Sequence, residues 1–225
     1  MTETPENRRP LKSRGTGWAQ GLASGLAKAG ASPDMISAGS IIFALIGLLL
    51  FLYAAGGDQT PFNRGALLIG AGVCIQLRLL CNLLDGMVAV EHGKGGPSGP
   101  IWNELPDRIA DALFLVGAGY FASLAGFTLG APLGWAAAVL AVLTAYVREL
   151  GRGLGFPADF SGPMAKPHRM AALTLTCAVA AFEPMWGWDG QSLILGLLLI
   201  VAGAAWTVLR RTRTLAARLA GREGA

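Results

Sequence analysis

Acidic residues gather between residues 81 and 111, a stretch that separates two strongly apolar regions of the 225-residue chain. On a helix, Arg78, Asn82 and Asp85 fall on one face, with Ala89 one turn farther along. Ionisable groups in or beside a membrane-crossing helix are costly unless they are paired, metal-bound or hydrated. These side chains therefore raise the question of what they hold.

A second polar face follows the loop HGKGGPSGP. Asn103, Asp107 and Asp111 recur every four residues, so they share one side of a helix that begins near residue 101. Because a short flexible loop joins the two helices, we expect them to be antiparallel neighbours whose polar faces meet. Three carboxylates and a carboxamide would then converge near one end of the pair.

The chemistry that suits this cluster is the binding of a hard divalent cation. Carboxylates that share a partly buried pocket repel each other and become protonated unless a cation neutralises them. Oxygen ligands favour Mg²⁺, Mn²⁺ or Ca²⁺ over zinc, and Mg²⁺ keeps open positions that phosphates fill. Gly86 and Ala89 leave room for a bulky group against the first helix. The residues thus indicate a metal site for a phosphorylated substrate.

Two simpler interpretations of the same residues stay open. The aspartates can be ordinary helix-end charges, with Asp107 and Asp111 neutralised by Arg108 or Arg78. Gly86 can be a packing notch between helices, as small residues often are in membranes. The combination of all these features on two neighbouring faces is what favours a site.

The elements that would position the site are membrane helices. Hydrophobic residues make up 53% of the chain and charged residues only 14%, against roughly 25% charged in an ordinary soluble domain. We predict an all-α integral membrane protein. The basic residues form no stripe interleaved with aromatic side chains, so nucleic-acid binding is not expected. The polar opening of the chain contains no apolar core, so a cleavable signal peptide is not expected either.

Uncharged runs predict six transmembrane helices, because a spanning helix needs about 20 mainly apolar residues. They cover residues 35–55, 65–84, two helices within 112–147 divided by a turn at 126–134, 170–182 and 190–209. An amphipathic helix within residues 15–30 is expected on the membrane surface. The resulting plan is a cytoplasmic segment over 1–30, a six-helix catalytic domain over 31–210, and a basic cytoplasmic tail over 211–225.

The distribution of basic residues predicts the orientation. With six spans, fifteen of the eighteen lysines and arginines fall on the side that carries both termini. Positive residues mark the cytoplasmic side of membrane proteins. We therefore expect both termini and the acidic stretch in the cytoplasm, and a bacterial inner membrane as the location. Gly- and Ala-rich helix faces are compatible with a homodimer.

The acidic stretch resembles the signature of the CDP-alcohol phosphotransferases, D-x2-D-G-x2-A-R followed after a spacer by G-x3-D-x3-D. Five of the eight signature positions agree in this sequence, and all eight are occupied by Asn82, Asp85, Gly86, Ala89, Val90, Asn103, Asp107 and Asp111. The family's six spans, its preceding surface helix and a T-P-N-like entry to the first span have counterparts here, the last as Ser32-Pro33-Asp34.

The resemblance implies a reaction and a set of roles. It implies transfer of a phosphoalcohol, most plainly a phosphatidyl group, from a donor such as CDP-diacylglycerol to an acceptor alcohol, with release of CMP. It implies Mg²⁺ or Mn²⁺ bound by signature residues, here Asn82, Asp85, Asp107 and Asp111, with Asp111 also the general base. Gly86 and Ala89 would accommodate the cytidine.

Three departures from the signature affect these roles. Asn82 replaces an aspartate, so a second metal would bind more weakly or not at all. Val90 replaces an arginine that would hold phosphate, and Arg78 or Arg108 can take its place. Asn103 replaces a glycine. The alternatives left open are a catalytically impaired member that binds the CDP-lipid and a cation-coupled transporter.

Basic residues later in the chain suggest a site for a phosphorylated acceptor. Arg148 and Arg152 are four residues apart at the end of a predicted span, and Lys166 and Arg169 stand at the entry to the next. The resemblance places this region near the acceptor cavity, which suits a glycerol or inositol phosphate. The alternative is that these residues reflect only the cytoplasmic charge bias.

Overall fold

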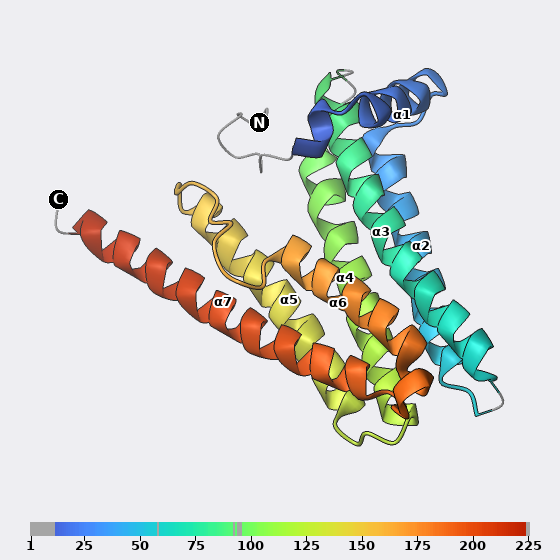
Figure 1. The fold of residues 1–225 in the computed structure, drawn as a ribbon. Coiled ribbons are helices and arrows are strands. Elements are labelled where there is room, and N and C mark those ends of the chain that lie inside the picture. Colours follow the sequence, from blue (N-terminus) through green and yellow to red (C-terminus); the bar gives the residue numbers. More distant parts are fainter. Residues whose placement is uncertain (1–11, 58, 92, 94–95, 224–225) are drawn as a thin grey trace.

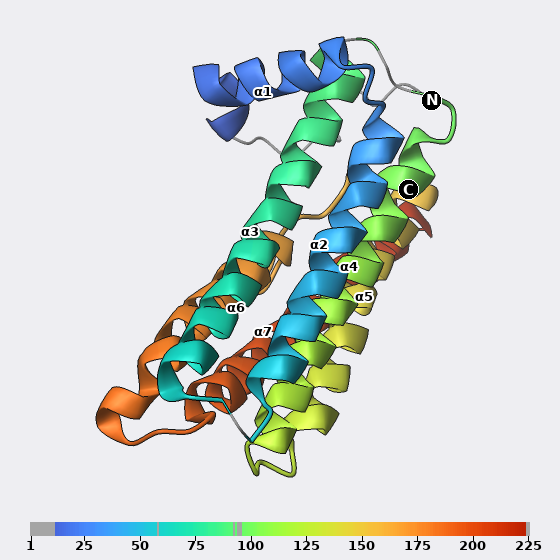
Figure 2. The ribbon, with the colours of Figure 1, turned by 90° about the vertical axis from the view of Figure 1, so that its right-hand side faces the viewer.

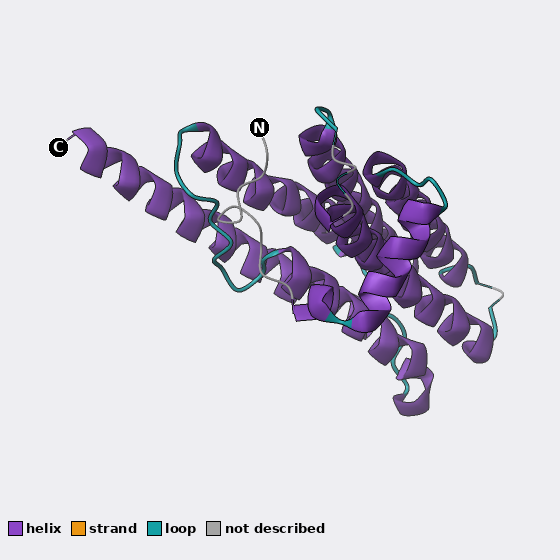
Figure 3. Cartoon of the chain, turned by 90° about the horizontal axis from the view of Figure 1, so that it is seen from above, coloured by secondary structure: helices purple, strands orange, loops and turns teal. Residues whose placement is uncertain are grey.

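The computed structural model describes residues 12–57, 59–91, 93 and 96–223, so the first eleven residues of the predicted cytoplasmic segment lie outside it. Within these ranges all regular structure is helical, as Figure 3 shows. The elements are η2 (Lys12–Gly15), α1 (Gly17–Lys28), α2 (Pro33–Ala54), α3 (Pro61–Glu91), α4 (Gly99–Leu124), α5 (Gly130–Gly153), α6 (Lys166–Phe182), η3 (Glu183–Trp186) and α7 (Gln191–Glu223).

Helices α2 to α7 pack as a ring in which neighbours in space are often distant in sequence. Going round the ring, α2 contacts α3, α3 contacts α6, α6 contacts α7, α7 contacts α5, α5 contacts α4, and α4 contacts α2 (Figures 1 and 2). The C-terminal ends of α3 and α5 and the N-terminal ends of α4 and α6 lie toward the same side of the bundle (Figure 1). The site therefore draws on residues that are far apart in the chain.

Four of the six helices are long and apolar enough to cross a membrane, namely α2, α3, α5 and α7. The other two lie where spans were expected but do not meet the requirements of length and low charge. Helix α6 has 17 residues, and the first half of α4 carries Glu104, Asp107, Arg108 and Asp111. The charges that shorten the apolar part of α4 are the ones that build the candidate site.

The start of α2 follows from its sequence. Ser32 occupies the N-cap and its hydroxyl accepts a hydrogen bond of 3.1 Å from the backbone N–H of Met35, with Pro33 in the first turn. Asp34 has another role, because its Oδ2 accepts a hydrogen bond of 3.0 Å from the hydroxyl of Ser98. The beginning of α2 is thereby tied to the residue before α4.

Helix α1 lies across the end of α3 (Figures 1 and 2). Its small residues Ala19 and Ala23 are fully buried and belong to a cluster with Leu84 and Met87 of α3. Two large apolar side chains of this helix, Trp18 and Leu22, are 55% and 47% exposed. The helix thus buries alanines against the bundle and leaves larger apolar side chains outside.

Glycines allow α4 and α5 to approach closely. A Cβ at Gly119 would lie 2.7 Å from the Cα of Gly134, and one at Gly134 would lie 2.8 Å from the Cα of Gly119. Small residues are the usual means by which membrane helices bring their backbones together. These two glycines are used within the chain, not at its outer surface.

Helix α7 extends well beyond the rest of the bundle (Figure 1). It runs without a break from Gln191 to Glu223 and so crosses residue 210, where a separate tail was expected to begin. Arg211 is buried, and its guanidinium donates hydrogen bonds to the backbone oxygens of Thr144 and Ser161, at 2.6 and 2.9 Å. The helix continues because these contacts hold it.

Candidate active site

The polar faces of α3 and α4 face each other, and residues one turn apart on α3 pair with residues one turn apart on α4. Arg78 Nη2 lies 2.5 Å from Asp111 Oδ1, and one turn along, the Asn82 amide donates a hydrogen bond to Asp107 Oδ1. In an antiparallel pair, moving forward on one helix means moving back on the other. Asp85 therefore stands at the level of Asn103, one turn nearer the loop between the helices.

Asp111 is the deepest of the three aspartates. Its carboxylate is 1% exposed, and its Oδ2 lies 2.5 Å from Arg169 Nη2, while Oδ1 bonds Arg78. Both arginines are completely buried. Two guanidinium groups thus hold both oxygens of Asp111, where a metal and a proton had been expected.

Asp107 is the centre of the cluster, with donors from three helices around it. Its Oδ1 accepts from Asn82 and lies 3.1 Å from Arg78 Nη2. Its Oδ2 accepts from the Lys166 ammonium of α6 and lies 3.7 Å from Arg108 Nη2. Lys166 and Arg108 are partly exposed, so Asp107 lies at the boundary between the buried arginines and solvent.

Asp85 differs from the other two aspartates because one of its oxygens has no hydrogen-bond partner among the described residues. The residue is 4% exposed, and its Oδ2 accepts a 2.5 Å hydrogen bond from the hydroxyl of Ser37 on α2. Its Oδ1 is buried and unpartnered. Asp85 also interacts electrostatically with Asp107 and Lys166. A buried carboxylate oxygen left in this state is expected to take a cation or water.

The residues present fit one hard cation rather than an extended acidic cage. Among the described residues, no three His, Cys, Asp or Glu side chains are grouped so that they could hold a metal ion. The free oxygen of Asp85, the neighbouring Asp107 carboxylate and the amide oxygen of Asn82 supply the ligand type that Mg²⁺ and Mn²⁺ prefer. Asp111 does not share in this set, because arginines occupy it.

Gly86 and Ala89 follow Asp85 on α3 and are half-buried, while Val90 is 53% exposed. They lie on the loop side of the acidic cluster. The small side chains expected to make room for a bulky ligand are thus beside the cluster and partly open to solvent.

The four basic residues expected at the acceptor site fall into two groups. Lys166 and Arg169 contact Asp107 and Asp111, as described above. Arg148 instead pairs with Glu104 at 2.5 Å and with Glu149 at 2.8 Å, and Arg152 pairs with Glu149 at 2.9 Å. Glu104 in turn binds Arg108 at 2.7 Å. These glutamates neutralise much of the positive charge expected there.

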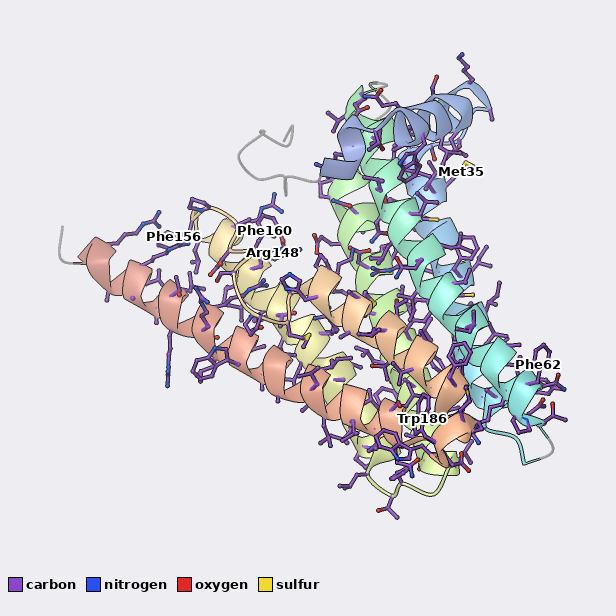
Figure 4. All side chains as sticks on the ribbon, viewed as in Figure 1. Met35, Phe62, Arg148, Phe156, Phe160 and Trp186 are labelled. Carbon is purple, nitrogen blue, oxygen red and sulfur yellow. The ribbon has the colours of Figure 1, made fainter. Side chains whose placement is uncertain are left out.

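A different basic pocket lies between α5, α7 and the loop that follows α5. Its charged lining consists of Arg148, Arg211, Arg218 and Asp159. Figure 4 places Arg148 next to Phe160 at this end of the molecule, and the guanidinium lies 5.6 Å from the ring centre. The sequence offered one signal for it, since Arg211, Leu215 and Arg218 are spaced along one helix face. Assigning residues 211–225 to a tail concealed that signal.

The ionisation of Asp159 is set by hydrogen bonds within its own loop. Its Oδ1 accepts a 2.8 Å hydrogen bond from the backbone N–H of Ser161. Partial burial pushes the pKa of Asp159 up, but hydrogen bonds from Ser161 outweigh it, and the pKa lies below its ordinary value. Asp159 is therefore a fixed negative charge within the basic pocket near neutral pH.

No protein-family model matches the chain. The chain is, however, similar in sequence to curated proteins. The phosphatidylinositol phosphate synthase of Mycobacterium tuberculosis (strain ATCC 25618 / H37Rv) is 26% identical over 196 residues, which are 86% of this chain and 83% of that protein. The phosphatidylinositol phosphate synthase of Mycobacteroides abscessus is 29% identical over 180 residues, 74% of this chain and 69% of that protein.

Solved structures share the fold. The phosphatidylinositol phosphate synthase of Mycobacterium tuberculosis, in complex with manganese and citrate, matches with a TM-score of 0.71 at 22% identity, covering 88% of each chain. The same enzyme with CDP-DAG bound also gives 0.71 at 22% identity, covering 88% of this chain and 92% of that one. Over most of its length the chain is thus similar to phosphatidylinositol phosphate synthases, and its residues on α3 and α4 resemble the signature of the CDP-alcohol phosphotransferase family.

Proposed function

We propose that the protein transfers a phosphatidyl group from a CDP-diacylglycerol-like donor to an acceptor alcohol and releases CMP, as a step in phospholipid biosynthesis. The relatives are named for the synthesis of a phospholipid of this kind. The observation that carries the proposal is the position of Asp107, which lies between Asn82 of α3 and Lys166 of α6, near the free oxygen of Asp85.

Asp107 is the better candidate for the general base. A base must have a carboxylate oxygen within reach of the acceptor hydroxyl. Both oxygens of Asp111 face buried arginines, whereas Asp107 lies at the edge of the cluster, where Lys166, the partner of its Oδ2, is 23% exposed. Asp111 is better explained as the charge that holds Arg78 and Arg169 in place.

This assignment also moves the second half of the family signature by one helical turn. Read as Gly99, Asn103 and Asp107, it matches as many signature positions as the reading that ends at Asp111. The levels of α3 and α4 favour it, because they set Asp107 beside Asn82. We therefore assign Asn82, Asp85, Asn103 and Asp107 as the residues that surround the divalent cation, Mg²⁺ or Mn²⁺.

The reaction divides among these residues as follows. A divalent cation held by these residues would spread the charge of the donor diphosphate, as metals do in phosphoryl transfer. Asp107 accepts the proton as the acceptor oxygen forms its bond to the lipid-bearing phosphorus, and the bond from that phosphorus to CMP breaks. Arg108 and Lys166 lie close enough to stabilise the phosphates. Gly86 and Ala89 leave space for the cytidine.

The acceptor is proposed to be a phosphorylated alcohol such as inositol phosphate. Arg148, Arg211 and Arg218 form a basic pocket, and Arg148 connects it to α4 through Glu104, one turn from Asp107. Bidentate donors of this kind suit a phosphate. Arg152 would then support Glu149 rather than touch the acceptor.

The membrane arrangement follows the charge distribution. We assign α2 to α7 as six spans, with both termini and the site in the cytoplasm of a bacterial cell, and α1 as an amphipathic helix on the inner membrane surface. The exposed Trp18 and Leu22 support contact of α1 with lipid. A homodimer in the membrane is part of the same proposal, and cross-linking in native membranes tests it.

The test is CMP release by purified protein supplied with CDP-diacylglycerol, Mg²⁺ and a panel of acceptors that contrasts inositol phosphate and glycerol phosphate with unphosphorylated inositol. We expect CMP only with donor, metal and a phosphorylated acceptor together. Binding of the CDP-lipid without CMP release across the panel would indicate an impaired member. Indifference to CDP-lipid would favour a transporter.

A further inference from the structure

The acidic cluster is already neutralised by the protein. The three carboxylates of Asp85, Asp107 and Asp111 are matched by the buried Arg78 and Arg169 and the partly exposed Lys166, while the nearby Arg108 is balanced by Glu104. Adding two divalent ions would leave four excess positive charges in a site whose arginines are completely buried. Uncompensated charge in such surroundings is strongly unfavourable. One ion leaves a much smaller excess, which the donor diphosphate balances.

The hydrogen bonds of the carboxylate oxygens also indicate room for a single ion. Both oxygens of Asp107 and both oxygens of Asp111 already accept hydrogen bonds from protein donors. Of the aspartate oxygens in the cluster, the one that is buried without a hydrogen-bond partner among the described residues is Oδ1 of Asp85. Asn82 supplies an uncharged amide at a position where a carboxylate would supply a negatively charged metal ligand. The cluster therefore has free capacity on one side only.

Lys166 is placed where a lysine is not expected for helix stability. It is the first residue of α6, and a positive charge near a helix N-terminus is disfavoured by the helix dipole. Pro167 in that first turn and the hydrogen bond from the Met164 N–H to Thr207 Oγ1, at 3.0 Å, fix the start of α6. The pairing of Lys166 with Asp107 offsets the unfavourable position.

We infer that this chain binds a single divalent ion, on the Asp85 side of the cluster beside Asp107, and that the Lys166 ammonium supplies the positive charge that a second ion would bring. The inference rests on the proposed function. Lys166 is thus a cation fixed to the protein that reaches Asp107 from α6. Asn82 of α3 has a matching effect, because its uncharged amide does not attract a second metal ion.

The experiment counts Mn²⁺ ions on the purified full-length chain by electron paramagnetic resonance. We expect one ion on the wild type, without the exchange coupling that two ions about 3.5–4 Å apart produce. The double variant Lys166→Met/Asn82→Asp should bind two coupled ions. Lys166→Arg, which keeps the charge, should still bind one. Two coupled ions on the wild type, or one ion on the double variant, would overturn the inference.

A milder variant guards against loss of folding. Lys166→Gln retains a hydrogen-bond donor and removes the charge, so we expect Mn²⁺ to bind about tenfold more tightly or better. An unchanged affinity in folded protein would contradict the role of Lys166. The CMP assay separates the two proposals, because a wild type that releases CMP with two ions refutes only the single-ion site. A wild type that neither binds Mn²⁺ nor releases CMP refutes the function itself.

Discussion

Arg78 and Asp111 face each other across α3 and α4, with 2.5 Å between Nη2 and Oδ1, and neither is more than 1% exposed. Arg169 completes the group from α6. These charges are buried, and their ion pairs join α3, α4 and α6 on the inner side of the site. This relationship supports the proposal that Asp111 is structural and Asp107 catalytic, and matched substitutions can separate the two roles.

Asp111→Asn should mainly reduce stability. The substitution leaves two buried guanidinium groups with too little negative charge, and breaking a buried pair in this way costs about 3–5 kcal/mol. We expect a clear fall in the melting temperature of the detergent-solubilised protein, followed by thermal unfolding in the presence and absence of Mg²⁺. A variant with unchanged stability and no CMP release would return the base role to Asp111.

Asp107→Asn should instead abolish turnover. The amide cannot accept the acceptor proton, and loss of a general base costs typically about 10²–10⁴-fold in rate. The loss should appear in kcat for CMP release at saturating acceptor. Because Asp107 is nearer to solvent than Asp111, the melting temperature should fall less than in Asp111→Asn. Near-normal kcat would exclude Asp107 as the base.

Asp85→Asn should weaken the dependence on metal. Within the acidic cluster of the described residues, the buried carboxylate oxygen without a hydrogen-bond partner is on Asp85, so removing its charge should raise the Mg²⁺ concentration for half-maximal CMP release by about tenfold or more. Asp189→Asn is the matched control, since that exposed residue pairs with Arg64 on the opposite side of the bundle. Equal metal dependence in both variants would move the cation away from Asp85.

Arg218→Met should raise the KM for the phosphorylated acceptor and leave kcat nearly unchanged. Arg218 lines the basic pocket and is exposed, so its loss removes one charge-assisted contact, worth about 1.5–3 kcal/mol, or roughly 10- to 100-fold in KM. Arg213→Met, on the same helix but outside the lining, is the control. If both variants behave alike, the acceptor phosphate binds elsewhere.

Gly119→Ala should destabilise the bundle, because the new Cβ would lie 2.7 Å from the backbone of Gly134. The helices must move apart, and overpacking of this kind costs about 1–3 kcal/mol. Gly21→Ala on α1 has no neighbour within 4 Å of the new Cβ and should be neutral or slightly stabilising. Melting temperatures of the two variants, measured side by side, check this packing.

The sequence predicted the helices well because their signal is local. Uncharged runs located all six helices of the ring, and the period of four residues put Asp107 on the same face as Asp111. The meeting of that face with Asn82 followed from a short loop. These inferences needed only helix geometry and the hydrophobicity of continuous segments.

The roles within the cluster depended on partners that a local pattern does not reveal. Arg169 and Lys166 reach the aspartates from α6, more than fifty residues along the chain. Without them, Asp111 looks as free to bind metal as Asp107. In the same way, the spacing of Arg148 and Arg152 suggests an anion site but does not reveal that Glu104 of α4 pairs with Arg148. Such pairings are set by tertiary packing.

The far end of α7 is joined to the segment that follows α5. The Arg222 guanidinium lies 3.9 Å from the ring centre of Phe156 and donates a 2.8 Å hydrogen bond to the backbone oxygen of Leu154. Arg211 holds the same segment farther along. A protein shortened at residue 210 would keep every apolar stretch needed for insertion into lipid. It would lose the contacts of Arg211 and Arg222 that hold the segment after α5. A single deletion would therefore leave membrane insertion intact and impair substrate selection.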